Sequence, residues 1–308
     1  MKGTEVDRAR ELILLAGATG TLGRVIARRL REEGRNVRAL SRDAKKLDAL
    51  AKLGAEPFVG DMRDRASMDK ACEGVTEIVS TANNIMGKGA GSPLRVDEAM
   101  YETLGAAART AAVRRWVHVS ARDITADSVV DFFRVKLKVE GIVKRSGVPW
   151  VAIRPSAFME IWTGVLFGNP DQPGPVATVF GRGERVCNFI AIEDVASFVL
   201  AVLRDPSVKN EVIDIGGPSQ MTLVQFSAPI QRALGVPEKR RHVPAPVLRM
   251  ASYAARPFNE VAARLASMGY WMTITDRAFP EWHASATRFG VQPMTVEQFA
   301  SRFSPPAR

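Results

Sequence analysis

Apolar runs and helically spaced apolar residues alternate along the first half of the chain. Residues 12–16 form an uninterrupted apolar run that ends at a glycine, which is typical of a strand buried on both faces. Residues 21–33 place their leucines, valine and isoleucine at helical spacing with arginines between them, and Gly34 follows as a C-cap would. The chain therefore opens with a predicted strand and a predicted helix.

The same alternation continues to residue 154. Further strands are predicted at 36–41, 56–60, 77–82, 116–120 and 150–154, and further helices at 44–53, 97–112 and 127–145. No hairpin signal joins consecutive strands, so the connections are predicted to be βαβ crossovers. The predicted fold is α/β, with a doubly wound parallel sheet of the Rossmann type.

The pattern changes after Pro155. Residues 164–185 are rich in glycine and proline and lack a clear period. A helix is predicted at about 193–203 and a strand at 212–215, and residues 222–225 fit a capping box that opens a helix to about residue 234. The remaining tail has helical spacing interrupted by prolines. We therefore expect residues 1–155 with about 190–216 to form the Rossmann domain, and about 156–189 with 217–308 to form a smaller, mostly helical lobe.

Composition excludes several classes of protein. The chain has 308 residues, of which 46% are hydrophobic and 25% charged, so it is neither disordered nor fibrous as a whole. The formal net charge of +10 raises nucleic-acid binding as a hypothesis, but basic residues are spread over nearly every segment with acidic ones among them. We expect a soluble cytoplasmic protein that binds neither nucleic acid nor membrane.

One segment needs a separate test for membrane binding. Residues 246–272 mix arginine with leucine, methionine, tyrosine and tryptophan, as an interfacial helix does. Pro257 and Gly269 divide the segment, which favours a lid or a part of the substrate lobe instead. No metal site is expected either, because Cys72 and Cys187 lie in unrelated patterns and the three histidines are scattered.

The sequence GATGTLG directly follows the first strand and opens the first helix. Such a loop needs glycine where the chain turns and where the backbone approaches a pyrophosphate, and the helix N-terminus favours the anion. This placement predicts dinucleotide binding by Gly17, Thr19, Gly20, Thr21, Leu22 and Gly23. A structural turn that binds nothing is the alternative.

The end of the second strand indicates which dinucleotide is bound. An NAD site would place an acidic residue about 20 residues beyond the loop. Here Ser41 and Arg42 stand at that place, and a guanidinium suits the 2′-phosphate of NADP. Asp43 would lie at the ribose if the register slipped by one residue. We expect NADP(H) as the cofactor.

With these residues in place, the chain resembles the atypical short-chain dehydrogenase/reductase superfamily and, more narrowly, the NmrA-like NAD(P)-binding proteins related to isoflavone reductases. The resemblance covers nearly the whole chain and includes GDMRD at 60–64, VHVSA at 117–121 and IRPSAFME at 153–160. It implies that Asp61 and Met62 lie by the adenine, and that Thr81, Ala82 and Asn83 pass the nicotinamide ribose. It also implies that Pro155, Ser156 and Phe158 border the nicotinamide.

The chain departs from the superfamily at its catalytic helix. The usual Tyr-x-x-x-Lys pattern pairs a lysine with a tyrosine whose lowered pKa allows proton transfer. Here the lysine is present as Lys136, but Phe132 occupies the tyrosine position. Ser120 keeps the place of the helper serine. The resemblance therefore implies catalytic roles for Lys136 and Ser120, a cofactor contact for Lys136, and doubt about the usual carbonyl chemistry.

Three functions remain open. The first is an NADPH-dependent reductase of a small, largely apolar acceptor (an enone, quinone, imine or carbonyl), in which Lys136 or water handles the proton. The second is a regulatory or redox-sensor protein that binds NADP(H) without turnover, and the third is a non-redox isomerase or cyclase. Phe132, Met159 and Trp162 are the expected substrate contacts, by position in relatives and apolar character. A homodimer is expected on weaker grounds.

Overall fold

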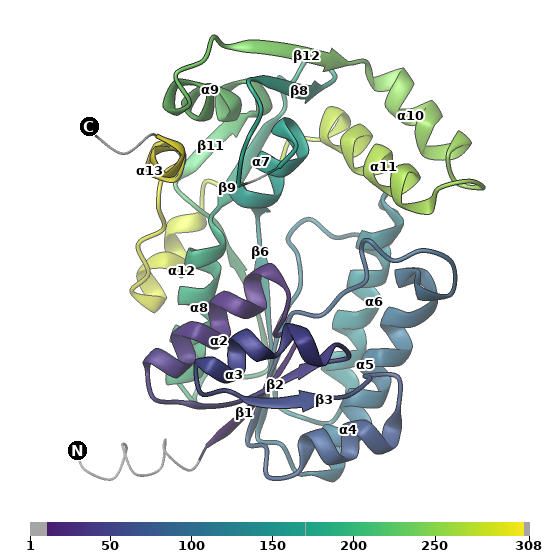
Figure 1. Ribbon diagram of the computed structural model, residues 1–308, viewed down its shortest axis with the longest axis vertical. Coiled ribbons are helices and arrows are strands. Elements are labelled where there is room, and N and C mark those ends of the chain that lie inside the picture. The colour runs from purple at the N-terminus through teal and green to yellow at the C-terminus, as the bar shows by residue number, and fades with distance from the viewer. Residues whose placement is uncertain (1–10, 170, 305–308) are drawn as a thin grey trace. The chain divides into compact units, whose positions relative to one another are not determined.

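Seven strands form the central sheet of the computed structural model, which describes residues 11–169 and 171–304. Their order is β10-β6-β5-β4-β1-β2-β3 (Figure 1). The strands are β1 (Leu12–Ala16), β2 (Asn36–Ser41), β3 (Glu56–Val59), β4 (Glu77–Ser80), β5 (Arg115–Val119), β6 (Trp150–Pro155) and β10 (Glu211–Ile215). Each pairing from β3 across to β6 is parallel.

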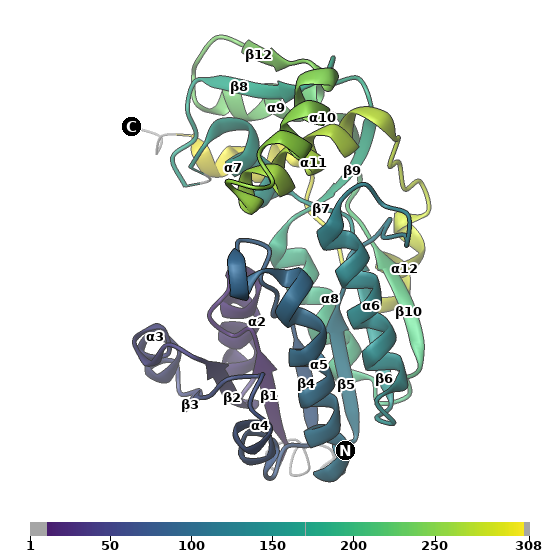
Figure 2. The same cartoon turned by 90° about the vertical axis from the view of Figure 1, so that its right-hand side faces the viewer.

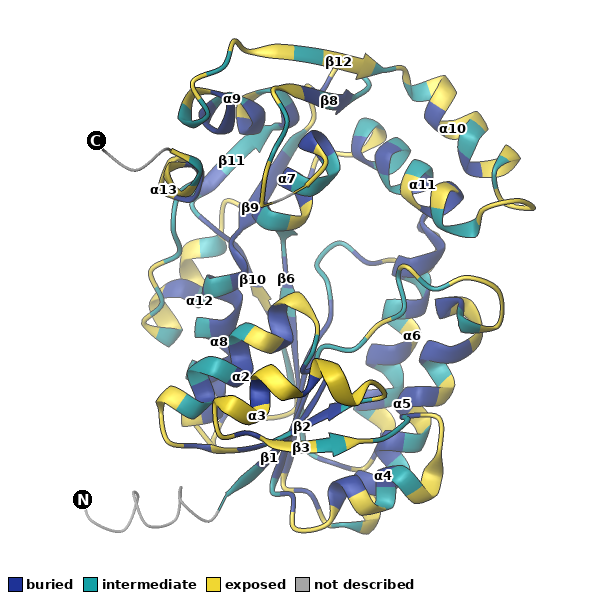
Figure 3. Cartoon of the chain, in the orientation of Figure 1, coloured by how far each residue is buried: buried dark blue, intermediate teal, exposed yellow. Residues whose placement is uncertain are grey.

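The apolar runs become the middle of this sheet. All residues of β4 and β5 are buried, as are four of the five in β1, whereas the edge strand β3 has no buried residue. Figure 3 shows the same gradient, with the central strands mostly dark blue. Strands covered on both faces lose contact with water along their whole length, which explains why they lack a polar alternation.

Helices cover both faces, as the doubly wound prediction requires. α2 (Thr21–Glu32) and α8 (Ile192–Arg204) lie together, and a hydrogen bond of 2.7 Å from Arg29 Nη1 to Ser197 Oγ joins them. The other face carries α4 (Arg65–Cys72), α5 (Pro93–Thr110) and α6 (Asp131–Arg145), which Figures 1 and 2 show side by side. The predicted Rossmann fold is confirmed.

The chain divides into two compact units. Unit 1 comprises residues 1–126, 132–154 and 196–213, and unit 2 comprises residues 127–131, 155–195 and 214–308. Unit 1 contains the glycine loop and nearly all of the central sheet. Each unit has its own hydrophobic core, which in unit 1 includes Leu14, Ile78 and Trp116.

Unit 2 contains two small sheets as well as helices. One sheet has the order β11-β9-β7 and the other pairs β12 with β8. Its elements are β7 (Ala157–Phe158), α7 (Met159–Phe167), β8 (Val176–Phe180), β9 (Val186–Ile190), β11 (Ser219–Thr222), α9 (Leu223–Ala233), β12 (Lys239–Val243), α10 (Ala245–Ala254), α11 (Glu260–Ile274), α12 (Trp282–Phe289) and α13 (Val296–Ala300). Thr222 and Gln225 make both bonds of the predicted capping box at the start of α9.

Several boundaries differ from the sequence predictions. The helix predicted at 44–53 is a 3₁₀ turn (Ala44–Lys46) followed by α3 (Asp48–Lys52), and α4 was not predicted. α5 begins at Pro93, because proline suits the first helical turn, where an N–H would have no partner.

None of the helices in the described part of the chain is long and apolar enough to cross a membrane.

Candidate functional site

The glycine loop is held between the first helix and the end of β4. Gly17 has φ +96°, and a Cβ placed on it would lie 2.6 Å from both Ala82 N and Thr81 Oγ1. Thr81 N donates to Ala16 O at 2.8 Å, so the end of β4 continues the sheet beside the loop. Only glycine combines this conformation with this approach.

The other two glycines differ in what surrounds them. A Cβ on Gly23 would overlap the backbone carbonyl of Gly17, so this glycine allows α2 to pack against the loop. A Cβ on Gly20 would meet only Gly17 O, at 3.3 Å, and Gly20 is exposed. Protein packing therefore requires Gly17 and Gly23 strictly, whereas the open side of Gly20 leaves the backbone accessible to a ligand.

The N-terminus of α2 is equipped for an anion. Gly20 N donates to Gly17 O and Arg24 N to Gly20 O, while the N–H groups of residues 21–23 have no protein acceptor within residues 11–169 and 171–304. Thr19 is partly buried and its carbonyl accepts from Arg24 Nε at 2.9 Å. No acidic residue lies in the first turn, so no carboxylate of that turn competes with an anion for these N–H groups and the positive end of the helix dipole.

Ser41 ends β2 and Arg42 follows it, and the neighbouring Asp43 makes hydrogen bonds within its own turn. Asp43 N donates to Ser41 Oγ at 3.1 Å, and Asp43 Oδ1 accepts from Lys45 N at 3.0 Å as the cap of the following 3₁₀ turn. The Arg42 side chain is exposed. One carboxylate oxygen of Asp43 therefore caps its own turn, and Arg42 and Asp43 are both exposed.

Asp61 is bonded to one guanidinium group and lies within electrostatic range of a second. Arg63 binds its carboxylate through Nε and Nη2, with the shortest distance 2.6 Å, and this bond lowers the pKa of Asp61 despite the opposing effect of burial. Arg42 is near enough to lower the same pKa further. Arg63 is a candidate that sequence reasoning did not single out, because its proximity to Arg42 depends on β2 and β3 pairing. Met62 is buried in the core of unit 1.

The segment after β4 is fixed by a buried tyrosine. Tyr101 OH donates to Ala82 O at 2.8 Å, and burial raises the pKa of Tyr101 above its usual value. Asn83 is exposed and its side chain bonds within its own turn. Because Tyr101 is buried and bonded to the backbone, it is not an accessible replacement for the missing catalytic phenol.

Lys136, Ser120 and Phe132 come together at the end of β5. Lys136 Nζ donates to Val119 O at 3.0 Å and lies 5.9 Å from the centre of the Phe132 ring. Burial lowers the pKa of Lys136 to about 8, against the opposing effects of Asp97 and Glu140. Ser120 Oγ is buried, without a hydrogen bond of good geometry in the described part of the chain. The structure thus brings Lys136, Ser120 and the buried Phe132 ring to the end of β5, and the catalytic roles of Lys136 and Ser120 stay predictions.

A buried polar cluster of Ser80, Trp116 and His118 was not predicted from the sequence. Ser80 Oγ accepts from Trp116 Nε1 at 2.8 Å and bonds His118 Nδ1 at 2.9 Å. Burial lowers the pKa of His118 to about 3, so its imidazole is neutral. A histidine inside an apolar strand gives no sequence signal for this bond, since its partner comes from another strand.

The remaining predicted residues belong to unit 2. Phe158 is partly buried, and Ser156 N donates to Ile215 O at 3.0 Å. Pro155 is buried at the end of β6, and Met159 and Trp162 lie in the core of unit 2. These positions account for Met159 and Trp162 through packing, and their expected role in substrate binding stays a prediction.

The parallel sheet, the glycine loop and the helix that follows it define the Rossmann class of α/β proteins. Within that class, the chain belongs to the NmrA-like family, whose model matches residues 9–300. The resemblance deduced from the sequence is thereby confirmed.

Several of the similar proteins are named as reductases. The chain is 30% identical over 249 residues to a (4-alkanoyl-5-oxo-2,5-dihydrofuran-3-yl)methyl phosphate reductase of Streptomyces griseus, covering 80% of this chain and 82% of the relative. It is 27% identical over 228 residues to an NAD(P)H azoreductase of Xenophilus azovorans, covering 73% and 75%. Its fold is similar, with TM-score 0.74 and 18% identity over 94% of this chain and 98% of the other, to an NADPH-dependent quinone oxidoreductase of Escherichia coli complexed with NADPH.

Proposed function

We propose that the protein is an NADPH-dependent reductase that transfers a hydride to a small, largely apolar acceptor such as an enone, quinone, imine or carbonyl. The observation that carries the proposal is the set of three N–H groups at the start of α2 that have no acceptor among the described residues, beside the open side of Gly20. These groups fit a pyrophosphate. The names of the Streptomyces and Xenophilus relatives support reduction as the reaction.

The preference for NADPH rests on arginines. Arg42 is exposed at the end of β2, and Arg63 is bonded to Asp61, whose pKa Arg42 also lowers. Both guanidinium groups suit the 2′-phosphate, whereas one carboxylate oxygen of Asp43 is engaged as the cap of its own turn. The Rossmann part (residues 1–155 with about 190–216) is the cofactor domain in this proposal, and the lobe recognises the acceptor.

The chain's own residues would supply orientation and a proton. NADPH, when bound, supplies the hydride, and each reduced acceptor also takes up one proton. Lys136 is held by Val119 O, and its pKa of about 8 leaves the ammonium mostly protonated at neutral pH. It can therefore donate that proton or hydrogen-bond the ribose. An acceptor that delocalises charge, such as a quinone, suits a site in which Phe132 replaces a phenol.

Titration calorimetry with NADPH, NADP⁺, NADH and NAD⁺, followed by a panel of quinones, enones and azo compounds, tests the proposal. Tight NADPH binding together with oxidation of NADPH when an acceptor is added is the expected result. Arg42→Met should weaken NADPH binding about tenfold or more, by losing charge-assisted bonds to the phosphate, and should change NADH binding less than about twofold. Arg109→Met, an exposed arginine at the end of α5, is the control. Equal losses for the two cofactors would count against the 2′-phosphate assignment.

A regulatory protein that holds NADP(H) without turnover is the second candidate. The observation that favours it is the buried Phe132 ring beside Lys136, which leaves Lys136 without a phenol to activate. Tight NADPH binding with no oxidation by any acceptor in the panel would favour this function over the reductase. A non-redox isomerase would instead convert its substrate without net oxidation of NADPH.

A further inference from the structure

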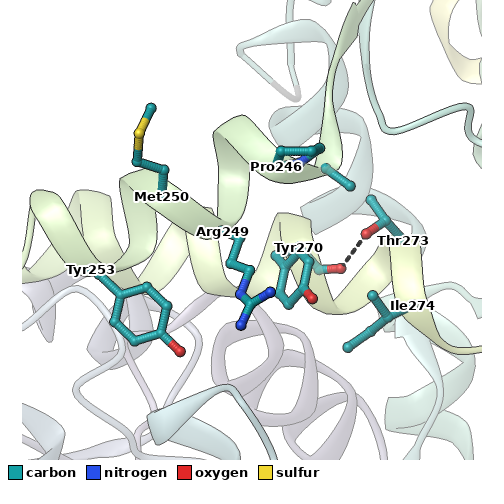
Figure 4. Close-up of a pocket in the computed structure, with 8 residues that line it drawn as sticks. Pro246, Arg249, Met250, Tyr253, Tyr270, Thr273 and Ile274 are labelled. Carbon is teal, nitrogen blue, oxygen red and sulfur yellow. Dashed lines mark hydrogen bonds between the residues drawn. The ribbon is translucent and has the colours of Figure 1, made fainter.

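A pocket of about 620 Å³ opens between α10 and α11 of unit 2 (Figure 4). Pro246, Met250 and Ile274 form its apolar wall, and Arg249, Tyr253 and Tyr270 supply its polar groups. Met250 and Tyr253 are 65% and 66% exposed, which is unusual for side chains of this size. The volume lies within the usual range for small-molecule sites.

The helix pair places these side chains on one side. Residues 246 and 250 are one turn apart on α10, as are 249 and 253, so each pair shares a face. Tyr270 and Ile274 have the same spacing on α11, and Thr273 Oγ1 donates to Tyr270 O at 2.6 Å. Figure 4 shows the polar ends of Arg249, Tyr253 and Tyr270 directed to the same side of the two helices.

α10 and α11 pack tightly against each other at Leu248 and Gly269, outside the pocket. Leu248 is buried, and a Cβ on Gly269 would lie 3.2 Å from its Cδ2 and 3.3 Å from the Phe180 ring. Asn259 caps α11 by accepting from Ala262 N at 3.0 Å. The pocket is therefore built on two helices that are fixed against each other.

The charge in the pocket is uncompensated. No acceptor for the Arg249 side chain lies among the described residues, and none of the residues that line the pocket is acidic. Two nearby arginines do have an acidic partner: Arg256 and Arg264 pair with Asp131 at 3.7 and 3.4 Å. The chain from 239 to 259 contains five lysines and arginines besides His242, and no aspartate or glutamate.

We propose that this pocket binds an organic anion. The guanidinium of Arg249 holds the sulfonate, phosphate or carboxylate group, the hydroxyls of Tyr253 and Tyr270 donate to its remaining oxygens, and the apolar body lies against Met250, Pro246 and Ile274. Such an anion could be the acceptor of the proposed reductase or a separate small ligand. The binding itself does not depend on the proposed function.

Naphthalene-2-sulfonate and naphthalene-2-sulfonamide form a matched pair of probes, because they share a body and differ in charge. Calorimetry on the full chain without cofactor should show the sulfonate binding at least about tenfold more tightly than the sulfonamide. Arg249→Met should abolish this difference. Arg182→Met, which removes an exposed arginine from a neighbouring pocket of the same unit, should preserve it. Circular dichroism and thermal melting should show both variants folded, because both side chains are exposed.

Equal binding of the two probes, no binding of either, or an unchanged preference in folded Arg249→Met would overturn the proposal. Kinetics with NADPH and 2-methyl-1,4-naphthoquinone distinguish whether the anion is the acceptor or a separate ligand. Competitive inhibition by naphthalene-2-sulfonate would identify the pocket as part of the acceptor site, whereas binding without inhibition would identify a separate ligand. If no acceptor is turned over, the calorimetric result still stands, so the two proposals fail separately.

Discussion

Substitutions at two glycines of the loop are predicted to have different effects, one on stability and the other on NADPH binding. Gly23→Ala should lower the free energy of unfolding by about 3 kcal/mol, because its Cβ would overlap the backbone carbonyl of Gly17 and backbone has little room to move. Gly20→Ala should change stability by less than about 1 kcal/mol, yet weaken NADPH binding about tenfold, because its Cβ enters the open side of the loop.

Chemical denaturation and calorimetry on the same two variants check this contrast. Wild-type NADPH affinity in folded Gly20→Ala would show that no ligand approaches the loop there. A Gly23→Ala variant as stable as the wild type would show that α2 can shift away from the loop.

Lys136 should give the reductase a pH dependence. As pH rises through about 8 the buried ammonium loses its proton, so a reaction that needs this proton should have a kcat/KM that falls above that pH. Lys136→Met should lower kcat/KM and remove this descending limb. Lys138→Met, an exposed lysine on the same helix that pairs with Glu98, should retain it. A descending limb that persists in Lys136→Met would assign the proton to another group.

At the scale of residues, the sequence predicted features that lie within one segment of the chain. It missed those that depend on the pairing of strands. The glycine loop and Arg42 could be proposed because strand, turn and helix follow one another along the chain. The bond between His118 and Ser80 could not, because it joins two neighbouring strands, and the nearness of Arg42 to Asp61 depends on the pairing of β2 with β3. Whether the predicted residues bind cofactor remains to be measured.

At the scale of elements, two helical glycines should respond in opposite directions to alanine. Alanine is favoured over glycine in a helix by about 1 kcal/mol. In α6 a Cβ on Gly141 would meet only the end of the flexible Arg145 side chain, so Gly141→Ala should raise the free energy of unfolding by up to about 1 kcal/mol. In α11 a Cβ on Gly269 would press on Leu248 and Phe180, so Gly269→Ala should lower it by about 1 kcal/mol or more.

Denaturant titrations of Gly141→Ala and Gly269→Ala test this predicted contrast in stability. Stabilisation by both substitutions would mean that α10 moves aside at no cost, and would contradict the rigid helix pair described above. The same Gly269→Ala variant should also bind naphthalene-2-sulfonate less tightly, because its pocket lies between these helices.

Most elements of the Rossmann part, α4 excepted, were predictable because they have a clear apolar run or helical period. The strands of unit 2 were not. β8 lies in a segment rich in glycine and proline, and β12 is the basic run Lys239–Val243, whose charges are typical of a solvated loop. Its residues form a strand because β8 offers a parallel partner, which no local pattern reveals.

At the scale of the whole molecule, the end of the sheet away from the glycine loop is closed by buried charge. Glu77 is 6% exposed and accepts from Arg115 at 2.6 Å and from Arg35 at 3.2 Å, and Arg115 also bonds three carbonyls around the end of α8. Glu77→Gln should lower the free energy of unfolding by about 3 kcal/mol, because it leaves buried guanidinium charge without its partner.

Glu56→Gln is the matched control. Its carboxylate bonds Arg38 at 2.8 Å but is half exposed, so its loss should cost at most about 1 kcal/mol. Guanidinium titrations at neutral pH measure both variants. NADPH affinity should remain at the wild-type value in each, since both residues lie at the strand starts. Equal losses of stability would show that burial does not strengthen the Glu77 ion pairs.

The contact between Gly17 and Thr81 also has a consequence for synthesis. Thr81 Oγ1 donates to Gly17 O across 64 positions of sequence, and β4, which ends just before Thr81, pairs with β1. A ribosome delivers the loop long before it delivers Thr81, so the nascent chain carries the glycines for some time without the wall that shapes them. Anion binding at α2 should therefore arise at a defined nascent-chain length, after β4 has left the exit tunnel.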